Sequence, residues 1–443
     1  MRARQSAKQV LLLHDTTTMG YGIHTQRSGM GKIAGGGMGF MAHFSLAVEE
    51  GTRKPLGLLG CTTFVRPEDV AEAEAESAAS VETGDDGGKT PHTHSTDGAA
   101  ESAVTVPERY ARKRPKSDKS RKAKRQDDPD NEGLRWAKQA LEIARGLGSV
   151  KVIHVMDREA DCFALVATLV AAGEFFVIRV KDDRVLADGN RLFANLAGMG
   201  LKLFRTIRLN ARAPAPGAKQ NKTNPPREER EAELEIAGGD ATIARPSHAP
   251  RNLPKSLNLN YVYVREPNPP PGCEPVVWRL MTNLPVATQE QMTRVVDIYR
   301  ARWTIEDFNK ALKTGCAFLR HQLESYGAIC KLLALLLPVA WMMLKLRHAA
   351  DHDPEAPATE VLSPGQLHIL RGLHDKDFPK SPMPKKPSVQ DAMWAVARLG
   401  GHFRKNGKPG WLTLGRGMHR LLEAELTLEA LGIRIGSKQI GAG

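Results

Sequence analysis

Charged and aromatic side chains recur at helical spacing between residues 299 and 313, in a pattern that could bind a metal ion and phosphate groups. At about 100° per residue they fall within one stripe, roughly 100° wide, on a helix that we predict over 289–314. The stripe consists of Tyr299, Arg302, Trp303, Glu306, Lys310 and Lys313. The opposite face is apolar and consists of Ile298, Ile305, Phe308 and Leu312. A carboxylate among cations and aromatic rings indicates an acidic metal ligand surrounded by groups that bind phosphate.

Two aspartates could complete a metal site with Glu306. Asp15 lies at the end of a predicted strand over 10–13, and Asp157 follows a predicted strand over 150–156. Taken alone, Asp15 could be a turn residue, Asp157 a helix cap and Glu306 half of a surface ion pair. Together, two aspartates on adjacent strands and a glutamate on a later helix can converge at one edge of a mixed sheet. Such a set suits Mg²⁺, and two ions about 4 Å apart would clamp the attacking and leaving oxygens of phosphoryl transfer.

The sheet that must position these carboxylates is predicted from short apolar runs. Strands are expected over 10–13, 40–48, 55–64, 150–156 and 175–180. Helices are expected over 132–147 and 158–172, so the order strand, helix, strand indicates a parallel pair with a right-handed crossover. Glu159 and Asp161, in the second of these helices, are predicted to be surface or supporting groups rather than metal ligands.

The composition is that of a basic globular protein. The 443 residues are 41% hydrophobic and 26% charged, which is ordinary, but the net charge of +13 favours nucleic acid or an anionic membrane as a partner. The most apolar stretch, 328–346, is interrupted by Lys331, Pro338 and Lys345, which favours a buried helix over a membrane span. The five cysteines form no CxxC pair, so we predict neither a zinc site nor a disulfide framework, and we expect a reducing cytoplasm.

Changes in composition divide the chain into six segments. We predict the first core strands over 1–65, a disordered insertion over 66–126, further core over 127–185, a β-rich insertion over 186–288, core helices over 289–350 and a helical region, expected to dimerise, over 351–443. Charge is segregated within the first insertion, because 67–108 hold 11 acidic residues against one Lys and 109–125 hold 10 basic residues against one Asp. The basic half could add nonspecific affinity for DNA, or the two halves could simply pair with each other.

At these motifs the chain resembles the DDE transposases, and within them the insertion sequence four family, whose best-known relative is the transposase of transposon five. The resemblance rests on His14-Asp15-Thr16-Thr17, on residues 155–161, and on the spacing Tyr299-x2-Arg302-x3-Glu306-x6-Lys313 within residues 298–315. It extends less tightly from residue 10 to about residue 430 and includes a segment over 410–417. It implies an α/β fold, a ribonuclease-H-like mixed-sheet catalytic core with a β-rich insertion and a helical C-terminal region.

The activity that this resemblance implies is cut-and-paste DNA transposition. Asp15, Asp157 and Glu306 would hold two Mg²⁺ ions, for which Mn²⁺ could substitute. Water would nick the element end, the freed 3′-hydroxyl would attack the opposite strand to give a hairpin, and the reopened 3′ end would attack target DNA. The implied partners are the inverted terminal repeats of the protein's own element, target DNA and a second copy of the chain on paired ends. We expect no membrane partner, and we expect the protein to be bacterial and associated with the nucleoid.

The same resemblance assigns residues that contact DNA. Hairpin formation requires a flipped-out base, which costs a few kcal/mol of unstacking. Trp278 matches the residue that stacks on this base, with a buried core tryptophan as the alternative. The matches to residues that bind phosphate near the flipped base are Tyr299, Arg302 and Lys313. Lys310, on the same helical stripe, and Arg179 are further candidate DNA contacts.

One departure from the family leaves other functions open. Family members carry an N-terminal helical domain that recognises the terminal repeats, whereas only 14 residues precede Asp15. We therefore expect a late start assignment, a truncated gene or recognition supplied from elsewhere. Two alternatives follow: a non-catalytic regulator that pairs with a full-length transposase, and a standalone structure-specific DNA nuclease.

Overall fold

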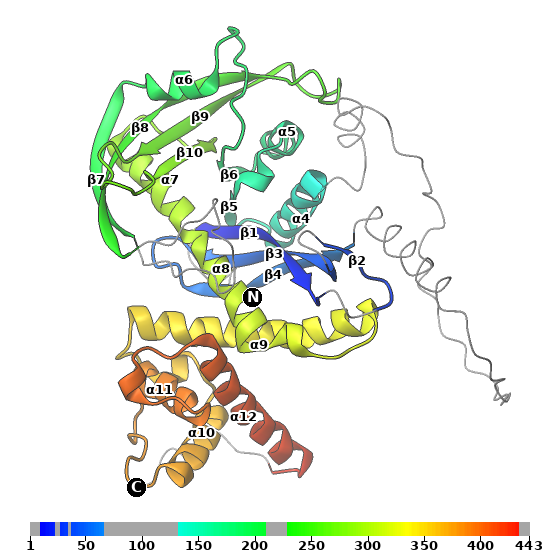
Figure 1. Cartoon of the computed structure of the whole chain (residues 1–443), viewed down its shortest axis with the longest axis vertical. Coiled ribbons are helices and arrows are strands. Elements are labelled where there is room, and N and C mark those ends of the chain that lie inside the picture. The colour runs from blue at the N-terminus through cyan, green and yellow to red at the C-terminus, as the bar shows by residue number, and fades with distance from the viewer. Residues whose placement is uncertain (1–8, 23–26, 34–36, 66–131, 210–227, 434–443) are drawn as a thin grey trace, which may run out of the picture.

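The computed structural model describes residues 9–22, 27–33, 37–65, 132–209 and 228–433 (Figure 1). The predicted charge-segregated insertion over 66–126 lies outside them. The strands are β1 (Gln9–Gly20), β2 (Gly31–Lys32), β3 (Met38–Glu49), β4 (Pro55–Phe64), β5 (Lys151–Met156), β6 (Phe175–Arg179), β7 (Leu201–Leu209), β8 (Arg230–Ala244), β9 (Ser256–Arg265) and β10 (Val277–Thr282). The α-helices are α4 (Glu132–Leu147), α5 (Phe163–Ala171), α6 (Leu192–Ala197), α7 (Gln289–Ala301), α8 (Trp303–Lys310), α9 (Tyr326–His352), α10 (Pro364–Asp377), α11 (Val389–Leu399) and α12 (Trp411–Ala430).

All ten described strands belong to one mixed sheet. Its order is β2-β3-β1-β5-β6-β10-β9-β8-β7, with β4 paired to β3. β1, β5 and β6 are parallel neighbours, and every other pairing is antiparallel. The predicted parallel pair β5–β6 is therefore confirmed. The four strands of the predicted β-rich segment extend the same sheet through the antiparallel pairing of β10 with β6.

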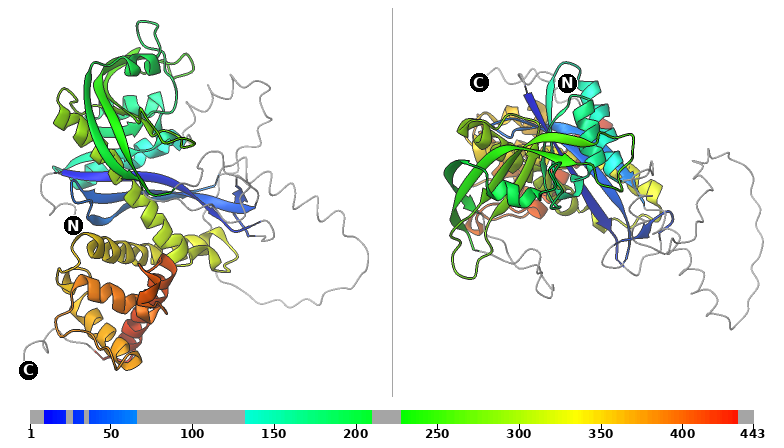
Figure 2. Two further views of the ribbon diagram at one scale, coloured as in Figure 1. Left: turned by 60° about the vertical axis from the view of Figure 1, so that its left-hand side comes forward. Right: turned by 90° about the horizontal axis from the view of Figure 1, so that it is seen from above.

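Helices cover both faces of the sheet. α4, α5 and α6 pack on one face, whereas α7 and α8 cross the other (Figure 1). Successive residues of β6 serve the two cores, since Phe176 and Ile178 join the cluster under α5 while Val177 joins the cluster with α7 and α8. The C-terminal helices α9 to α12 gather beyond the sheet (Figure 2). This arrangement confirms the predicted fold class, a mixed α/β core consistent with the ribonuclease-H-like fold.

The first strand is longer than predicted. A strand ending at residue 13 was expected, but β1 continues to Gly20 and pairs with β3 over its whole length, so that Asp15 lies opposite Phe44. The prediction followed the apolar run and was wrong at its end. Residues 16–18 are threonines, whose β-branched side chains suit a half-buried strand although they are polar.

The predicted helix over 289–314 is also interrupted. It is divided into α7, α8 and a π-helical turn, η2 (Ala311–Gly315), with Arg302 at the junction of α7 and α8. The Arg302 amide donates to the Tyr299 carbonyl three residues back, which tightens the chain locally. The apolar back of the helix is confirmed, because its four predicted members are buried: Ile298, Ile305, Phe308 and Leu312.

The helix predicted over 158–172 likewise begins differently. A 3-10 turn, η1 (Arg158–Ala160), comes first, and α5 starts only at Phe163. Asp161 lies between the two, buried, where its carboxylate accepts hydrogen bonds from the backbone amides of Lys181 and Asp182 and pairs with Arg184 at 2.5 Å. Of the two predicted alternatives, surface or supporting group, Asp161 therefore takes the second: it ties the end of β6 to the α5 side of the sheet.

Helix α9 is less buried than its apolar sequence predicts. Its sequence is long and apolar enough to cross a membrane by length and composition, the one such helix among the described residues, and 28% of its most apolar window is buried. One side packs against β4, α8, α11 and α12, but Leu335 is 72% exposed. The expectation of a buried helix is thus met on one side only.

The segment over 410–417 brings α12 close to the end of η2. A Cβ on Gly415 would lie 1.8 Å from the Gly315 carbonyl oxygen at the end of η2, and a Cβ on Gly417 would lie 1.7 Å from the Val396 carbonyl oxygen. Only glycine allows backbones this close. The C-terminal helices are thereby packed directly against the chain that carries Glu306.

Candidate active site

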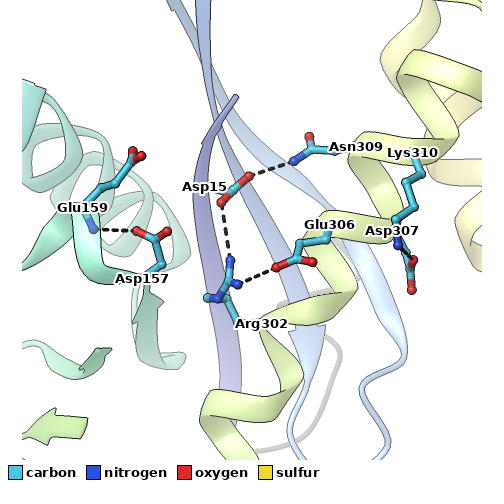
Figure 3. Close-up of polar contacts among 8 residues, drawn as sticks. All are labelled: Asp15, Asp157, Glu159, Arg302, Glu306, Asp307, Asn309 and Lys310. Carbon is cyan, nitrogen blue, oxygen red and sulfur yellow. Dashed lines mark hydrogen bonds and ion pairs between the residues drawn. The ribbon is translucent and has the colours of Figure 1, made fainter. Parts of the chain in front are cut away.

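Three carboxylates approach one another from separate elements (Figure 3). β1 and β5 are parallel neighbours with Leu13 opposite Val155, so Asp15 and Asp157 each lie two residues further along and on the same face. Glu306 comes from α8, which packs on β1. The convergence at the carboxyl end of β5, beside the middle of β1, follows from this register and from the helix that crosses it.

Arg302 lies between two of these carboxylates. Its Nη2 donates to Glu306 Oε1 at 2.5 Å, and its Nη1 lies 3.5 Å from Asp15 Oδ1. Burial by itself lowers the pKa of Arg302, but the charges of Tyr299, Glu306, Asp15 and Asp157 together raise it above its usual value. The guanidinium is therefore fixed as a cation at the centre of the acidic group.

The surroundings of Asp15 raise its pKa strongly. Burial raises its pKa from 3.8 to about 7, the Asp157 and Glu306 carboxylates add to the increase, and Arg302 and a hydrogen bond from Asn309 oppose it. Asn309 Nδ2 donates to Asp15 Oδ2 at 2.8 Å. One arginine thus compensates the negative charge of the three carboxylates only in part. A divalent cation would neutralise the remaining negative charge.

Asp157 has the capping role that its position allows. Its Oδ1 accepts the backbone N–H of Glu159 at 2.8 Å and caps η1. The other oxygen, Oδ2, accepts no hydrogen bond within the described part of the chain. Capping therefore orients this carboxylate through Oδ1 and leaves Oδ2 available to another ligand.

The donor set suits a hard divalent cation once Arg302 moves aside. Three carboxylates supply only oxygen, as Mg²⁺ and Mn²⁺ prefer. In the arrangement described for residues 9–22, 27–33, 37–65, 132–209 and 228–433, no three His, Cys, Asp or Glu side chains lie close enough to hold a metal ion. The guanidinium of Arg302 occupies the space between Asp15 and Glu306, and this keeps the two carboxylates too far apart to share a metal ion.

The raised pKa of Asp15 predicts that the metal-free fold loses stability as pH rises. Between pH 4 and pH 7 the carboxyl is ionised in the unfolded chain but still protonated in the folded one. The loss reaches up to about 4 kcal/mol above pH 7. We expect Asp15→Asn to gain stability over the wild type in EDTA, and to gain more at pH 8 than at pH 4.5, in urea unfolding. An equal difference at the two pH values would contradict the raised pKa.

The predicted phosphate-binding lysines border a hollow beside Glu306. It has a volume of about 300 Å³ and is lined by Glu306, Asn309, Lys310, Lys313 and Thr314. Lys313 is not free, because its Nζ donates to Thr17 Oγ1 at 2.6 Å and to the Thr18 carbonyl at 2.8 Å; burial lowers its pKa. Lys310 pairs with Asp307 at 3.0 Å and is largely exposed.

The aromatic candidates form a cluster beside the carboxylates. The ring of Trp278, on β10, lies 6.0 Å from Tyr299 and 5.9 Å from Trp303. Trp278 is 6% exposed and Tyr299 is buried, whereas Trp303 is 41% exposed. Arg179, at the end of β6, donates from Nη2 to the Val277 carbonyl at 3.2 Å. Trp278 is thus placed as a core side chain, and stacking on a base would require it to move.

Sequence reasoning missed two groups of residues at the site. Asn309 lies three residues after Glu306, at the margin of the predicted stripe, so helical periodicity could have found it. The other group is a buried polar chain beneath Asp15. His14 Nε2 lies 3.1 Å from His154 Nδ1, His14 Nδ1 lies 2.8 Å from Ser45 Oγ, and Gln139 Nε2 donates to Ser45 Oγ at 2.6 Å. The pairing of β1 with β3 and β5, together with the packing of α4, brings these residues together.

One known family matches about half of the chain. Residues 137–342 match a family model described as a transposase DDE domain. The match includes Asp157, Glu306 and the aromatic cluster, and Asp15 lies before it. The match supports the assignment of this chain to a DDE transposase family, and it supports a transposase function. Assignment to the insertion sequence four family stays a prediction.

Proposed function

We propose that this chain is a cut-and-paste DNA transposase of an insertion sequence of the insertion sequence four type, with Asp15, Asp157 and Glu306 as its catalytic carboxylates. One observation carries the proposal: the chain that matches a transposase DDE domain supplies Asp157 and Glu306, and β1 places a third carboxylate, Asp15, within electrostatic reach of both. We infer that it acts in the bacterial cytoplasm, as a homodimer on paired element ends.

The three carboxylates would hold the divalent metal ions that DDE transposases generally use. When bound, Mg²⁺ supplies a Lewis acid that stabilises charge on the phosphoryl oxygens and on the leaving 3′-oxygen. The donors come from two strands and a helix with buried, apolar backs, so they are held on rigid elements.

The neighbouring side chains would position DNA. Arg302 exchanges its bond to Glu306 for a phosphate, where its planar fork can make two hydrogen bonds. Lys310 and Lys313, which line the hollow beside Glu306, bind backbone phosphates there. Asn309 holds Asp15 in orientation through Nδ2. The Trp303 ring, exposed next to Trp278, offers a surface on which a base can stack.

Trp278→Ala should impair hairpin formation more than first nicking, because stacking on a flipped base is needed only for the second step. The substitution also removes a buried ring, which costs about 3–5 kcal/mol of stability. Trp278→Phe is the matched control, since it keeps an aromatic face and most of the buried volume. Nicked and hairpin products are quantified on one end-labelled substrate at a temperature where both variants are folded. Equal loss at both steps would favour the core-tryptophan alternative.

The proposal is tested with purified protein and the inverted repeats that flank its gene. With Mg²⁺ we expect cleavage at the repeat ends and joining of the freed 3′ ends to a target plasmid. Cleavage without joined product would identify a nuclease instead. Failure of both, together with inhibition of a full-length transposase on addition of this chain, would identify a regulator.

A further inference from the structure

A second, larger cleft lies apart from the carboxylates. Its volume is about 870 Å³, and it opens between the turn that joins β3 to β4, the edge strand β7 and α7. Arg300 and Asp297, which line it from α7, lie roughly 100–160° around that helix from Tyr299. Arg302 and Tyr299 face the catalytic group. The cleft and the catalytic group therefore lie on opposite sides of one helix, which is about 10–12 Å across.

Three arginines line the cleft near a single carboxylate, and two of them pair with it. Arg205 Nη1 and Arg300 Nη1 lie 2.9 Å and 3.4 Å from the same oxygen of Asp297. Arg53, at the β3–β4 turn, is partly buried and has no side-chain partner within the described residues. Its pKa is lowered by burial and by the charges of Arg300 and Arg205. Arg300 Nε is buried without a hydrogen-bond partner. This arginine cluster, Arg53, Arg205 and Arg300, thus carries positive charge in excess of Asp297.

The remaining charges of the cleft are mostly balanced. Arg294 pairs with Glu50 at 2.7 Å, and Lys202 pairs with Glu235 at 2.9 Å. Glu290, at the first turn of α7, lines the same cleft and offsets part of its positive charge. The arginine cluster supplies the cations of the cleft that have too few carboxylate partners. Arg53 also adopts a left-handed backbone conformation, with φ of 59°, where glycine is the usual residue.

An exposed aromatic ring adjoins the cluster. Phe204, on the edge strand β7, lines the cleft and is 76% exposed. Guanidinium groups that approach a phosphate and an aromatic ring that is free to stack on a base are the two elements of single-strand DNA binding.

We propose that this cleft binds the sugar–phosphate backbone of a DNA strand, with an unpaired base stacked on Phe204. The inference rests on the proposed transposase function. It adds to it a second contact surface, formed by the arginine cluster, for single-stranded or locally opened DNA.

The test measures DNA binding by the full chain in EDTA, by fluorescence anisotropy, with a 12-nucleotide single strand and the matching duplex. The variants are Arg53→Gln and Phe204→Ala, and Arg251→Gln is the matched control because Arg251 is exposed in the loop before β9. Both test residues are partly or largely exposed, and melting curves verify that each variant is folded.

We expect Arg53→Gln to lower single-strand affinity about tenfold and to reduce the salt slope by about 0.7. Phe204→Ala should lower single-strand affinity about tenfold at an unchanged salt slope and leave duplex affinity unaltered. Wild-type affinity in both variants, from a protein that cleaves its element ends, overturns the cleft assignment alone. Variants that lose affinity only for inorganic phosphate or a free nucleotide, and not for DNA, would also overturn the cleft assignment. A wild-type protein that binds neither DNA overturns the proposed function as well.

Discussion

Glu306→Gln should abolish DNA cleavage and strand transfer while leaving DNA binding nearly unchanged. The amide keeps the size of the side chain and its place on α8, but it lacks the negative charge that a divalent ion requires. Loss of groups that only support metal ligands typically costs 10- to 100-fold, so loss of a ligand should lower cleavage by at least about a hundredfold. Binding is measured in EDTA, and cleavage in Mg²⁺ under single-turnover conditions.

Asp307→Asn is the matched control for this variant. Asp307 is the next carboxylate on the same helix and pairs with Lys310 at the surface. We expect its cleavage rate to stay within about threefold of the wild type, since an exposed ion pair contributes little. Metal-dependent cleavage that persisted in Glu306→Gln would remove Glu306 from the catalytic carboxylates.

Arg302→Gln should destabilise the metal-free protein and increase its response to Mg²⁺. Arg302 is mostly buried and pairs with Asp15 and Glu306, so removing it leaves two carboxylates without their cation. Breaking such a pair costs about 3–5 kcal/mol. In EDTA at pH 8 we therefore expect a lower midpoint of thermal unfolding. On addition of Mg²⁺ the variant should gain more stability than the wild type, because no guanidinium competes for the carboxylates.

Lys310→Gln is the corresponding control, since it removes a cation from the same face of α8 but breaks only the exposed pair with Asp307. Its unfolding free energy should change by less than about 1 kcal/mol. An Arg302→Gln protein as stable as the wild type in EDTA, with the same response to Mg²⁺, would mean that Arg302 does not neutralise the acidic group.

Much of the fold was predictable because its signals are local. The bounds of α4 and the apolar back of the region around Glu306 follow from helical periodicity, and the parallel pair β5–β6 follows from the order strand, helix, strand. The end of β1 was missed because a run of threonines looks like a turn until a partner strand pairs with it. The break at Arg302 was missed because one tightened turn leaves no trace in the hydrophobic pattern.

The charge balance of the site could not be read from spacing alone. Spacing placed Arg302 and Glu306 on one face, but not the guanidinium between Glu306 and Asp15, because Asp15 comes from a strand far away in sequence. The burial of Trp278 likewise depends on β10 packing against α7. The arginine cluster combines a turn, an edge strand and a helix that are separated by more than 90 residues, so only the folded chain brings it together.

The most direct test of the central claim, that Asp15, Asp157 and Glu306 form one metal site, is Mn²⁺ binding at pH 8 measured by electron paramagnetic resonance. Wild type, Asp15→Asn, Asp157→Asn, Glu306→Gln and the control Asp307→Asn are compared at equal DNA concentration. We predict that each of the first three substitutions weakens binding at least about tenfold and that the control binds as the wild type does. Wild-type Mn²⁺ affinity in the Asp15, Asp157 and Glu306 variants would contradict the shared site.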